Sequence, residues 1–211
     1  MTLYPVFLDL AGRDVLLVGG GNVAASKLDG LVTANARITV VAPVINDAIR
    51  AHDVTVVERG FQESDLDGIW WVVAAAPPEV NRLVANAAAQ RRVFVNAVDD
   101  KGAASAFLGG VVRRGLVEIA ISTGGAAPAL AGLLREGLDA VLPADLERWV
   151  AVALQKRPEW KAANVPITER RPLLLRAIER LYAPQVNPVP DASSDLGTLA
   201  HPGVDSPQEP S

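Results

Sequence analysis

The chain has 211 residues, half of them hydrophobic and 21% charged, so it can bury a sizeable core and is not largely disordered. It has no cysteine, which excludes disulfide frameworks and thiolate chemistry, and its two histidines leave little material for a metal site. A net charge of −4 argues against a nucleic-acid binder. No apolar run is long enough to span a bilayer, and the N-terminus lacks a secretory signal. We therefore expect a cytoplasmic protein that binds neither nucleic acid nor membrane.

The first hundred residues alternate short apolar runs with helical stretches. We expect strands at 14–18, 37–41, 54–57, 69–75 and 93–98, and helices at 22–34 and 78–90. Continuous Val, Ile and Leu strands separated by helices are typical of a parallel sheet covered on both faces. The fold class predicted from this pattern is α/β, with a Rossmann-type parallel sheet.

The pattern changes after Asp99. Two β-like runs at 105–113 and 116–121, joined by Arg114-Gly115, predict an antiparallel hairpin outside the parallel sheet. Helices are expected at 126–142, 145–155 and 167–182. From 184 to 211 Pro, Ser, Asp and Gly dominate, which predicts a disordered tail.

A glycine-rich loop follows the first predicted strand. Its sequence, Gly19-Gly20-Gly21-Asn22-Val23-Ala24, fits the dinucleotide-binding pattern G-x-G-x-x-A and opens a predicted helix. Gly19 would permit the tight turn, Gly21 would let the backbone approach a pyrophosphate, and Ala24 would keep helix and strand close. The helix N-terminus would add free N–H groups for the phosphates. The alternative is a glycine-rich turn that binds no ligand.

The residue that usually holds the adenosine ribose is missing from this pattern. No acidic residue stands at the end of the second strand, and Asp47 follows too late in the sequence. We expect backbone groups near Pro43 and Val44 to hold the adenosine instead. No arginine is present there to meet a 2′-phosphate, so NAD is preferred over NADP.

Several segments together resemble one known family. They are Tyr4 to Leu10, Gly19 to Lys27, Asn96 to Asp99, Ser122 to Ala131, Leu133 to Glu136 and Thr168 to Arg171. In this order and at this spacing, the chain resembles the precorrin-2 dehydrogenase / sirohydrochlorin ferrochelatase family over about residues 3–182. That family includes the N-terminal half of bifunctional siroheme synthases. The methyltransferase half of those enzymes has no counterpart here, so methylation is not expected.

The resemblance implies an architecture and a reaction. The implied parts are an NAD-binding Rossmann domain at 1–108, a dimerisation segment at 109–143, a helical domain at 144–183 and the tail at 184–211. The implied reaction is NAD-dependent oxidation of precorrin-2 to sirohydrochlorin in a homodimer, with ferrous iron then inserted as a substrate to give siroheme. The chain departs from the family pattern at Asn22, Ala106, Gly109, Thr123 and Ala127, and these departures bear on iron insertion more than on oxidation.

Asp99 is the candidate catalytic residue. It lies at the carboxyl end of a predicted parallel strand, where open α/β sheets place ligands, and it matches the family's catalytic aspartate. A carboxylate there could accept a proton during oxidation and pyrrole protons during iron insertion. Otherwise Asp99 is a turn former or a helix cap.

The resemblance places the tetrapyrrole against the loop of Ser122, Thr123 and Gly124. A hydroxyl in this loop could equally cap the helix that follows. Because the substrate carries many carboxylates, arginines are useful partners, and we expect Arg113 and Arg135 to serve. Each could equally be a solvated surface charge.

Three functions from different classes remain open. The first is the dehydrogenase, with or without chelatase activity. The second is an NAD-sensing Rossmann module without catalysis, which would need no carboxylate at position 99. The third is a tetrapyrrole carrier or chelatase that has lost the use of NAD, and the intact glycine loop argues against it.

Overall fold

The structure is a computed structural model that describes residues 2–182, so the predicted tail at 184–211 lies outside the described residues. The chain forms two compact units, Met1–Glu147 and Arg148–Ser211. Within residues 2–182, no helix is long and apolar enough to cross a membrane.

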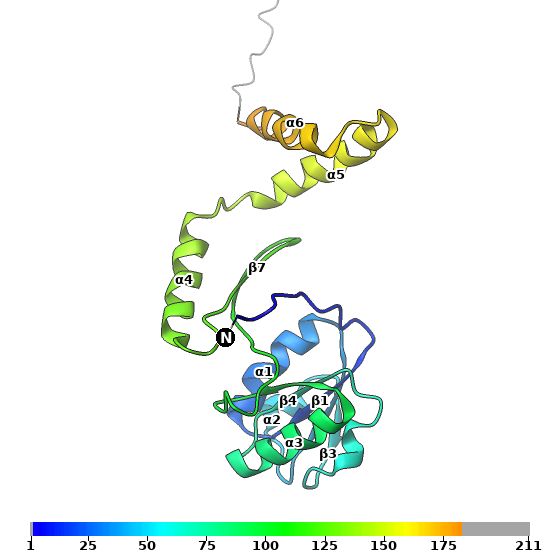
Figure 1. The fold of residues 1–211 in the computed structure, drawn as a ribbon, viewed down its shortest axis with the longest axis vertical. Helices are drawn as coiled ribbons and strands as arrows, with labels where there is room; N and C mark the ends of the chain where they lie inside the picture. The colour runs from blue at the N-terminus through cyan, green and yellow to red at the C-terminus, as the bar shows by residue number, and fades with distance from the viewer. Residues whose placement is uncertain (1, 183–211) are drawn as a thin grey trace, which may run out of the picture. The chain divides into compact units, whose positions relative to one another are not determined.

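The first unit is built on a five-stranded parallel sheet with the strand order β3-β2-β1-β4-β5 (Figure 1). The strands are β1 (Asp14–Val18), β2 (Arg37–Val41), β3 (Thr55–Val57), β4 (Trp71–Ala74) and β5 (Phe94–Ala97). All neighbours pair in parallel, which confirms the predicted Rossmann-type α/β fold. The runs expected at 14–18 and 37–41 are strands over those residues.

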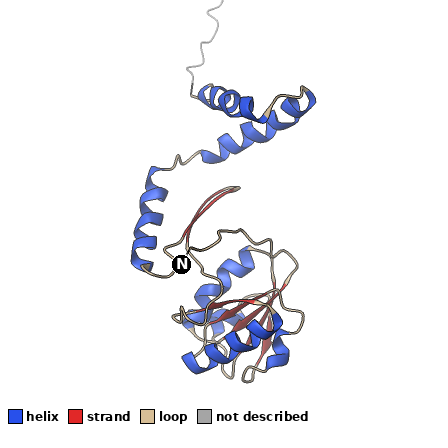
Figure 2. Cartoon of the chain, viewed as in Figure 1, coloured by secondary structure: helices blue, strands red, loops and turns tan. Residues whose placement is uncertain are grey.

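Helices cover both faces of this sheet (Figure 2). Side chains of β1 alternate between the faces: Val15 and Leu17 pack in the cluster with α1, whereas Leu16 and Val18 pack in the cluster with α3. All four are buried, which explains why the sequence shows a continuous apolar run rather than an alternating one. The covering elements are α1 (Asn22–Thr33) and α2 (Asp47–Arg50) on one face, and α3 (Pro78–Arg91) and the short 3₁₀ helix η1 (Glu63–Leu66) on the other.

The strand order creates a switch point beside β1. The chain proceeds from β1 to β2 and β3 in one direction, and then returns to β4 on the other side of β1. In parallel sheets of this kind, ligands bind outside the carboxyl ends of the strands where the order reverses. The glycine loop, which follows β1, lies at that point.

An antiparallel hairpin and a helix follow the parallel sheet. The hairpin pairs β6 (Gly110–Arg114) with β7 (Val117–Ile121), and α4 (Pro128–Val141) contacts both strands. The prediction of a hairpin is confirmed, but its first strand begins at Gly110 rather than at 105. Two further helices are α5 (Leu146–Ala162) and α6 (Ile167–Glu179).

Ser105 and Ala106 are held by β5 instead of joining the hairpin. Their N–H groups donate to the carbonyl of Val95 at 2.9 and 3.0 Å, and the Val95 N–H donates to Ser105 Oγ at 2.9 Å. Asn96 Nδ2 donates to the carbonyl of Ala106 at 3.0 Å. These bonds occupy backbone groups of β5, which is an edge strand of the parallel sheet. Residues 105–106 therefore cover that edge instead of joining the hairpin.

Two glycines let the glycine loop pass close to neighbouring strand ends. Gly19 has φ +130°, and a Cβ there would lie 2.3 Å from the carbonyl oxygen of Ala75. A Cβ on Gly20 would lie 1.9 Å from the carbonyl oxygen of Val44. Both contacts are with backbone, which cannot move aside cheaply. The loop is thus fixed against the segments that follow β4 and β2.

We predict that Gly20→Ala lowers the free energy of unfolding by about 1–3 kcal/mol, or prevents folding, because the added methyl overlaps the Val44 carbonyl. Gly21→Ala is the matched control, since a Cβ at Gly21 meets nothing within 4 Å. Urea denaturation of both variants measures the difference. Equal stability of the two variants would contradict this packing.

Candidate active site

The first turn of α1 presents an open, uncapped N-terminus to the carboxyl edge of the sheet. Gly21 is its N-cap residue, makes no side-chain capping bond, and is followed by no acidic residue in the first turn. Unlike at Gly20, a Cβ at Gly21 would meet no protein atom within 4 Å. Exposed N–H groups, a positive helix end and space beside the backbone all suit a phosphate. These features fit the pyrophosphate of a dinucleotide.

A hollow of about 550 Å³ lies on the β2 side of this turn. Its lining residues are Gly20, Gly21, Val44, Ile45, Asn46 and Asp47. Of the two residues expected to hold adenosine, Val44 lines the hollow and Pro43 is not among its lining residues. The side of the glycine loop expected to receive the adenosine half of NAD is therefore hollowed.

Asn46 joins this hollow to the glycine loop. Its N–H donates to the carbonyl of Gly20 at 2.8 Å, and its Nδ2 donates to Asn22 Oδ1 at 2.6 Å. Its Oδ1 accepts the N–H of Ala48 at 2.8 Å and so caps α2. Asn22, expected to contact the cofactor, thus has its amide oxygen engaged within the chain.

Asn46 was not anticipated from the sequence, and Asp47 was set aside because it follows too late after the second strand. The structure brings Asp47 to the hollow although it stands six residues after the end of β2, because α2 begins at once and turns the chain back. An Asn followed by a short apolar stretch is a helix-start signal that could have indicated this return.

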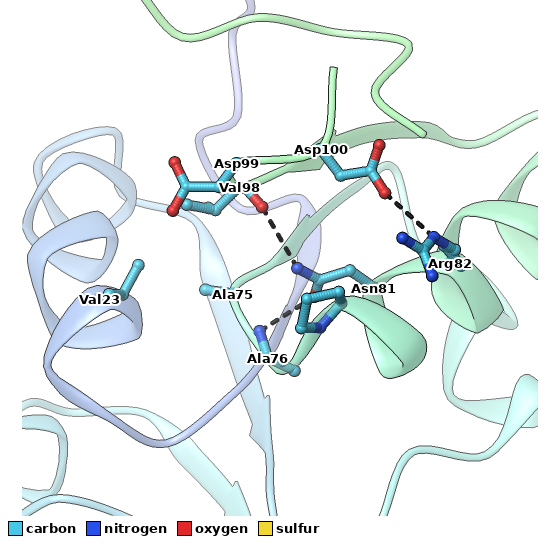
Figure 3. A pocket seen from close by; sticks show the side chains of 9 residues that line it. Val23, Ala75, Ala76, Asn81, Arg82, Val98, Asp99 and Asp100 are labelled. Carbon is cyan, nitrogen blue, oxygen red and sulfur yellow. Dashed lines mark hydrogen bonds and ion pairs between the residues drawn. The ribbon is translucent and has the colours of Figure 1, made fainter. Parts of the chain in front are cut away.

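A second cavity, of about 380 Å³, lies on the β4 and β5 side (Figure 3). Its lining residues are Val23, Ala75, Ala76, Pro78, Asn81, Arg82, Val98, Asp99 and Asp100. Val23 belongs to the first turn of α1, so the cavity begins where the glycine loop ends. Predicted catalytic Asp99 and predicted cofactor residue Val23 are brought together here.

The two adjacent aspartates in this cavity have different surroundings. Asp100 Oδ1 accepts the N–H groups of Gly102 and Ala103 at 3.1 Å each, and Asp100 Oδ2 lies 3.4 Å from Arg82 Nε. Within residues 2–182, the carboxylate of Asp99 has no hydrogen-bond or ion-pair partner. Figure 3 shows the Asp100 carboxylate turned toward Arg82 and that of Asp99 turned away from it. Asp100 therefore helps to form the turn, and the Asp99 carboxylate is available to a ligand in the cavity.

Asn81 is a further residue of this site that the sequence did not reveal. It is 2% exposed and bridges the segments that follow β4 and β5. The Ala76 N–H donates to Asn81 Oδ1 at 3.0 Å, and Asn81 Nδ2 donates to the carbonyl of Val98 at 3.4 Å. In an alanine-rich helix, a polar residue is expected to face solvent, so nothing in the sequence marked it.

The loop of Ser122, Thr123 and Gly124 forms a tight turn before α4. Ser122 Oγ accepts the N–H of Gly124 at 3.1 Å, and Thr123 Oγ1 accepts the N–H of Ala127 at 3.2 Å. Gly124 and Gly125 have φ +60° and +69°. A Cβ at Gly125 would contact Phe107 and Lys101, so this loop lies beside the segment that follows Asp99.

The two arginines expected to bind substrate do not line the Asp99 cavity. Arg113 Nε donates to Glu118 Oε1 across the hairpin at 2.7 Å, and Arg135 Nη2 donates to Glu136 Oε1 at 3.2 Å. Both side chains stay partly exposed. Arg82 lines the cavity instead.

Perturbed carboxylates lie outside this site. The Arg37 guanidinium, hydrogen-bonded to Asp14 at the start of β1, lowers the pKa of that carboxyl. Arg59 lowers the pKa of Asp65 in η1 in the same way. Among residues 2–182, no three His, Asp or Glu side chains gather as a candidate metal site.

Two family models match the chain. A model described as putative NAD(P)-binding covers residues 6–110, and one described as sirohaem biosynthesis protein central covers residues 117–140. The first match spans the parallel sheet with both hollows. The second spans β7 and nearly all of α4.

Individual relatives agree with these models. Siroheme synthase from Citrobacter koseri is 41% identical over 172 residues, and that from Photobacterium profundum is 42% identical over 158. These stretches cover 79% and 72% of the chain, but 38% and 34% of those relatives. The solved structure of SirC, precorrin-2 dehydrogenase, is 28% identical, with a TM-score of 0.68, over 85% of this chain and 92% of that one. The chain belongs to the precorrin-2 dehydrogenase / sirohydrochlorin ferrochelatase family.

Proposed function

We propose that this chain catalyses the NAD-dependent oxidation of precorrin-2 to sirohydrochlorin. The observation that carries the proposal is the carboxylate of Asp99, which has no partner in the part of the chain that the structure describes and lines a cavity that begins at the first turn of α1. A dinucleotide whose pyrophosphate lies on that turn has one half on the β2 side and the other on the β4 side. The nicotinamide half would therefore reach the cavity of Asp99. The names of the relatives and of SirC support precorrin-2 as the substrate.

The proposed reaction needs a base beside the cofactor. NAD, when bound, supplies the acceptor for a hydride. One C–H bond of the substrate breaks with both electrons leaving as that hydride, and a proton is lost as the new double bond forms. Asp99 accepts this proton, because its oxygens are exposed and free. Asp100 is less suited, since its carboxylate is held by two backbone N–H groups and Arg82.

The hollow on the β2 side supports NAD rather than NADP. Asp47 brings an exposed carboxylate to the lining of this hollow. A carboxylate can accept hydrogen bonds from ribose hydroxyls, whereas it would repel a 2′-phosphate. The role expected for backbone groups near Pro43 and Val44 is thus shared with Asp47.

Ferrous iron insertion into sirohydrochlorin is the second proposed activity. Metal insertion displaces two pyrrole N–H protons, and the same carboxylate could accept them in the same cavity. The alternative is a dehydrogenase that does not insert iron. An NAD-sensing module is less well supported, because it has no use for a free carboxylate at position 99.

The tetrapyrrole would be held by the loop of Ser122, Thr123 and Gly124. This loop lies beside Lys101 and Phe107, in the segment after Asp99. Arg113 and Arg135 would contribute by binding substrate carboxylates. A guanidinium has five N–H donors, so each arginine can keep its glutamate and still bind a carboxylate.

A homodimer is part of the proposal. The face of α4 that its contacts with β6 and β7 leave uncovered carries Leu130, Leu133, Leu134 and Val141, which are 45–75% exposed. Burial of such a stripe against a second copy would stabilise both hairpins, since a two-stranded sheet is marginal alone.

We predict that the chain is a dimer at micromolar concentration, and that Leu133→Glu shifts it toward monomer by placing a charge in the apolar stripe. Leu83→Glu, at a 61% exposed position on α3, should leave the dimer unchanged. Light scattering after size exclusion measures both. A wild-type monomer at that concentration would contradict the dimer.

Gly21→Asp should raise the KM for NAD by about tenfold or more, because it places bulk and negative charge where the pyrophosphate would lie. Gly30→Asp is the control, since Gly30 is an open position at the other end of α1. Steady-state kinetics with precorrin-2 and NAD measures both. Iron insertion by Gly21→Asp should persist, and an unchanged KM for NAD would remove the glycine loop from cofactor binding.

Asp99→Asn should lower kcat for precorrin-2 oxidation by about 10²–10⁴-fold, because the amide keeps the shape but cannot accept the proton. The KM for NAD should stay near the wild-type value. Asp100→Asn, which keeps an oxygen for the N–H groups of Gly102 and Ala103, should lose much less activity. Asp99→Asn at wild-type rate, in a folded protein that binds NAD, would overturn the assignment.

A further inference from the structure

The direction of the Asp99 carboxylate depends on its backbone. No side-chain bond within residues 2–182 holds the carboxylate in place. Its φ of +59° is a left-handed conformation, which a few per cent of residues other than glycine adopt, Asp and Asn more often than most. Such a conformation persists only where the surrounding structure enforces it. Whatever fixes the residues before and after Asp99 therefore sets the direction of its Cα–Cβ bond, from which the carboxylate extends.

The residue before Asp99 is fixed on both sides. The Val98 N–H donates to the carbonyl of Ala74 at 2.9 Å, which continues the pairing of β5 with β4. The Val98 carbonyl, which belongs to the peptide group joining it to Asp99, accepts a bond from Asn81 Nδ2 at 3.4 Å. Rotation of that peptide group would change φ of Asp99, so Asn81 restrains it.

Asn81 is suited to this task by its chemistry and its burial. The Ala76 N–H needs an acceptor and the Val98 carbonyl needs a donor, and one amide side chain supplies both. At 2% exposure it has almost no competition from water. An aspartate of the same size would accept from Ala76 but could not donate to Val98 when ionised.

Asp100, the residue after Asp99, is contacted by a side chain from the same turn of α3 as Asn81. Arg82, the neighbour of Asn81, places Nε 3.4 Å from Asp100 Oδ2. Figure 3 shows the two side chains reaching the sequence neighbours of Asp99: Asn81 points toward Val98, and Arg82 points toward Asp100. Arg82 is largely exposed, so its contribution is the weaker of the two.

We propose that Asn81 is the positioning residue for Asp99, and that it aims the carboxylate into the cavity by fixing the peptide group between Val98 and Asp99. This inference rests on the proposed function of Asp99 as the base. The competing explanation is that Asn81 only satisfies two buried backbone groups and contributes stability without affecting the reaction.

The first test compares Asn81→Ala and Asn81→Asp with Asn86→Ala, an exposed asparagine on the same helix. We expect both Asn81 variants to lower kcat for precorrin-2 oxidation by about 10- to 100-fold, as a small displacement of a reacting group does. The KM for NAD should change less than twofold, and Asn86→Ala should match wild type. Loss of thermal stability with unchanged kcat would overturn the proposal.

The second test combines Asn81→Ala with Asp99→Asn. If Asn81 acts through Asp99, the double variant should be no slower than Asp99→Asn alone. If the two losses multiply, Asn81 acts elsewhere and the positioning role is wrong. Full activity of Asp99→Asn alone would instead show that the proposed base is wrong. Should Asn81→Ala fail to fold, Asn81→Asp, which keeps the volume and the acceptor, replaces it in the same cycle.

Discussion

The close approach of the glycine loop to two strand ends is the constraint on which the site depends. Only glycine fits at position 20, because the Val44 carbonyl occupies the space that a Cβ would need. Gly19 meets the same limit at Ala75, on the opposite side of β1. The loop thereby lies at the switch point of the sheet and opens toward a hollow on each side. A dinucleotide laid across it would reach both β2 and β5.

Two consecutive aspartates at this edge of the sheet, Asp99 and Asp100, differ in their hydrogen-bond partners. Asp100 is engaged by the backbone of the next turn, which leaves it a structural role. Among residues 2–182, Asp99 has no hydrogen-bond or ion-pair partner, and its backbone has a positive φ. Uncommon backbone conformations of this kind cluster at functional sites, which agrees with the proposed role of Asp99. The proposed cofactor binding and the proposed proton transfer thus fall to two segments, the loop after β1 and the turn after β5.

The sequence predicted the parallel sheet well because its strands are buried on both faces and so appear as unbroken apolar runs. Because the same apolar runs mark where each strand ends, the sequence also placed the glycine loop and Asp99 together at the carboxyl edge of the sheet. The hairpin was predicted to begin too early, since residues 105–106 bond to β5 rather than to β7. Asp47 was set aside as too late in the sequence, because a four-residue helix shows no periodicity that would indicate the return of the chain. Asn81 was missed because tertiary contacts, not a local pattern, bury its amide. No sequence pattern predicted the positive φ of Asp99.

The most direct measurement is a single-turnover reaction in which the purified chain is mixed with precorrin-2 and NAD without oxygen. The spectra of NADH and sirohydrochlorin are followed together. We expect the two products to appear in equal amounts and at the same rate, with little turnover when NADP replaces NAD. A folded protein that binds both reactants yet forms neither product would contradict the assignment of this chain as a dehydrogenase.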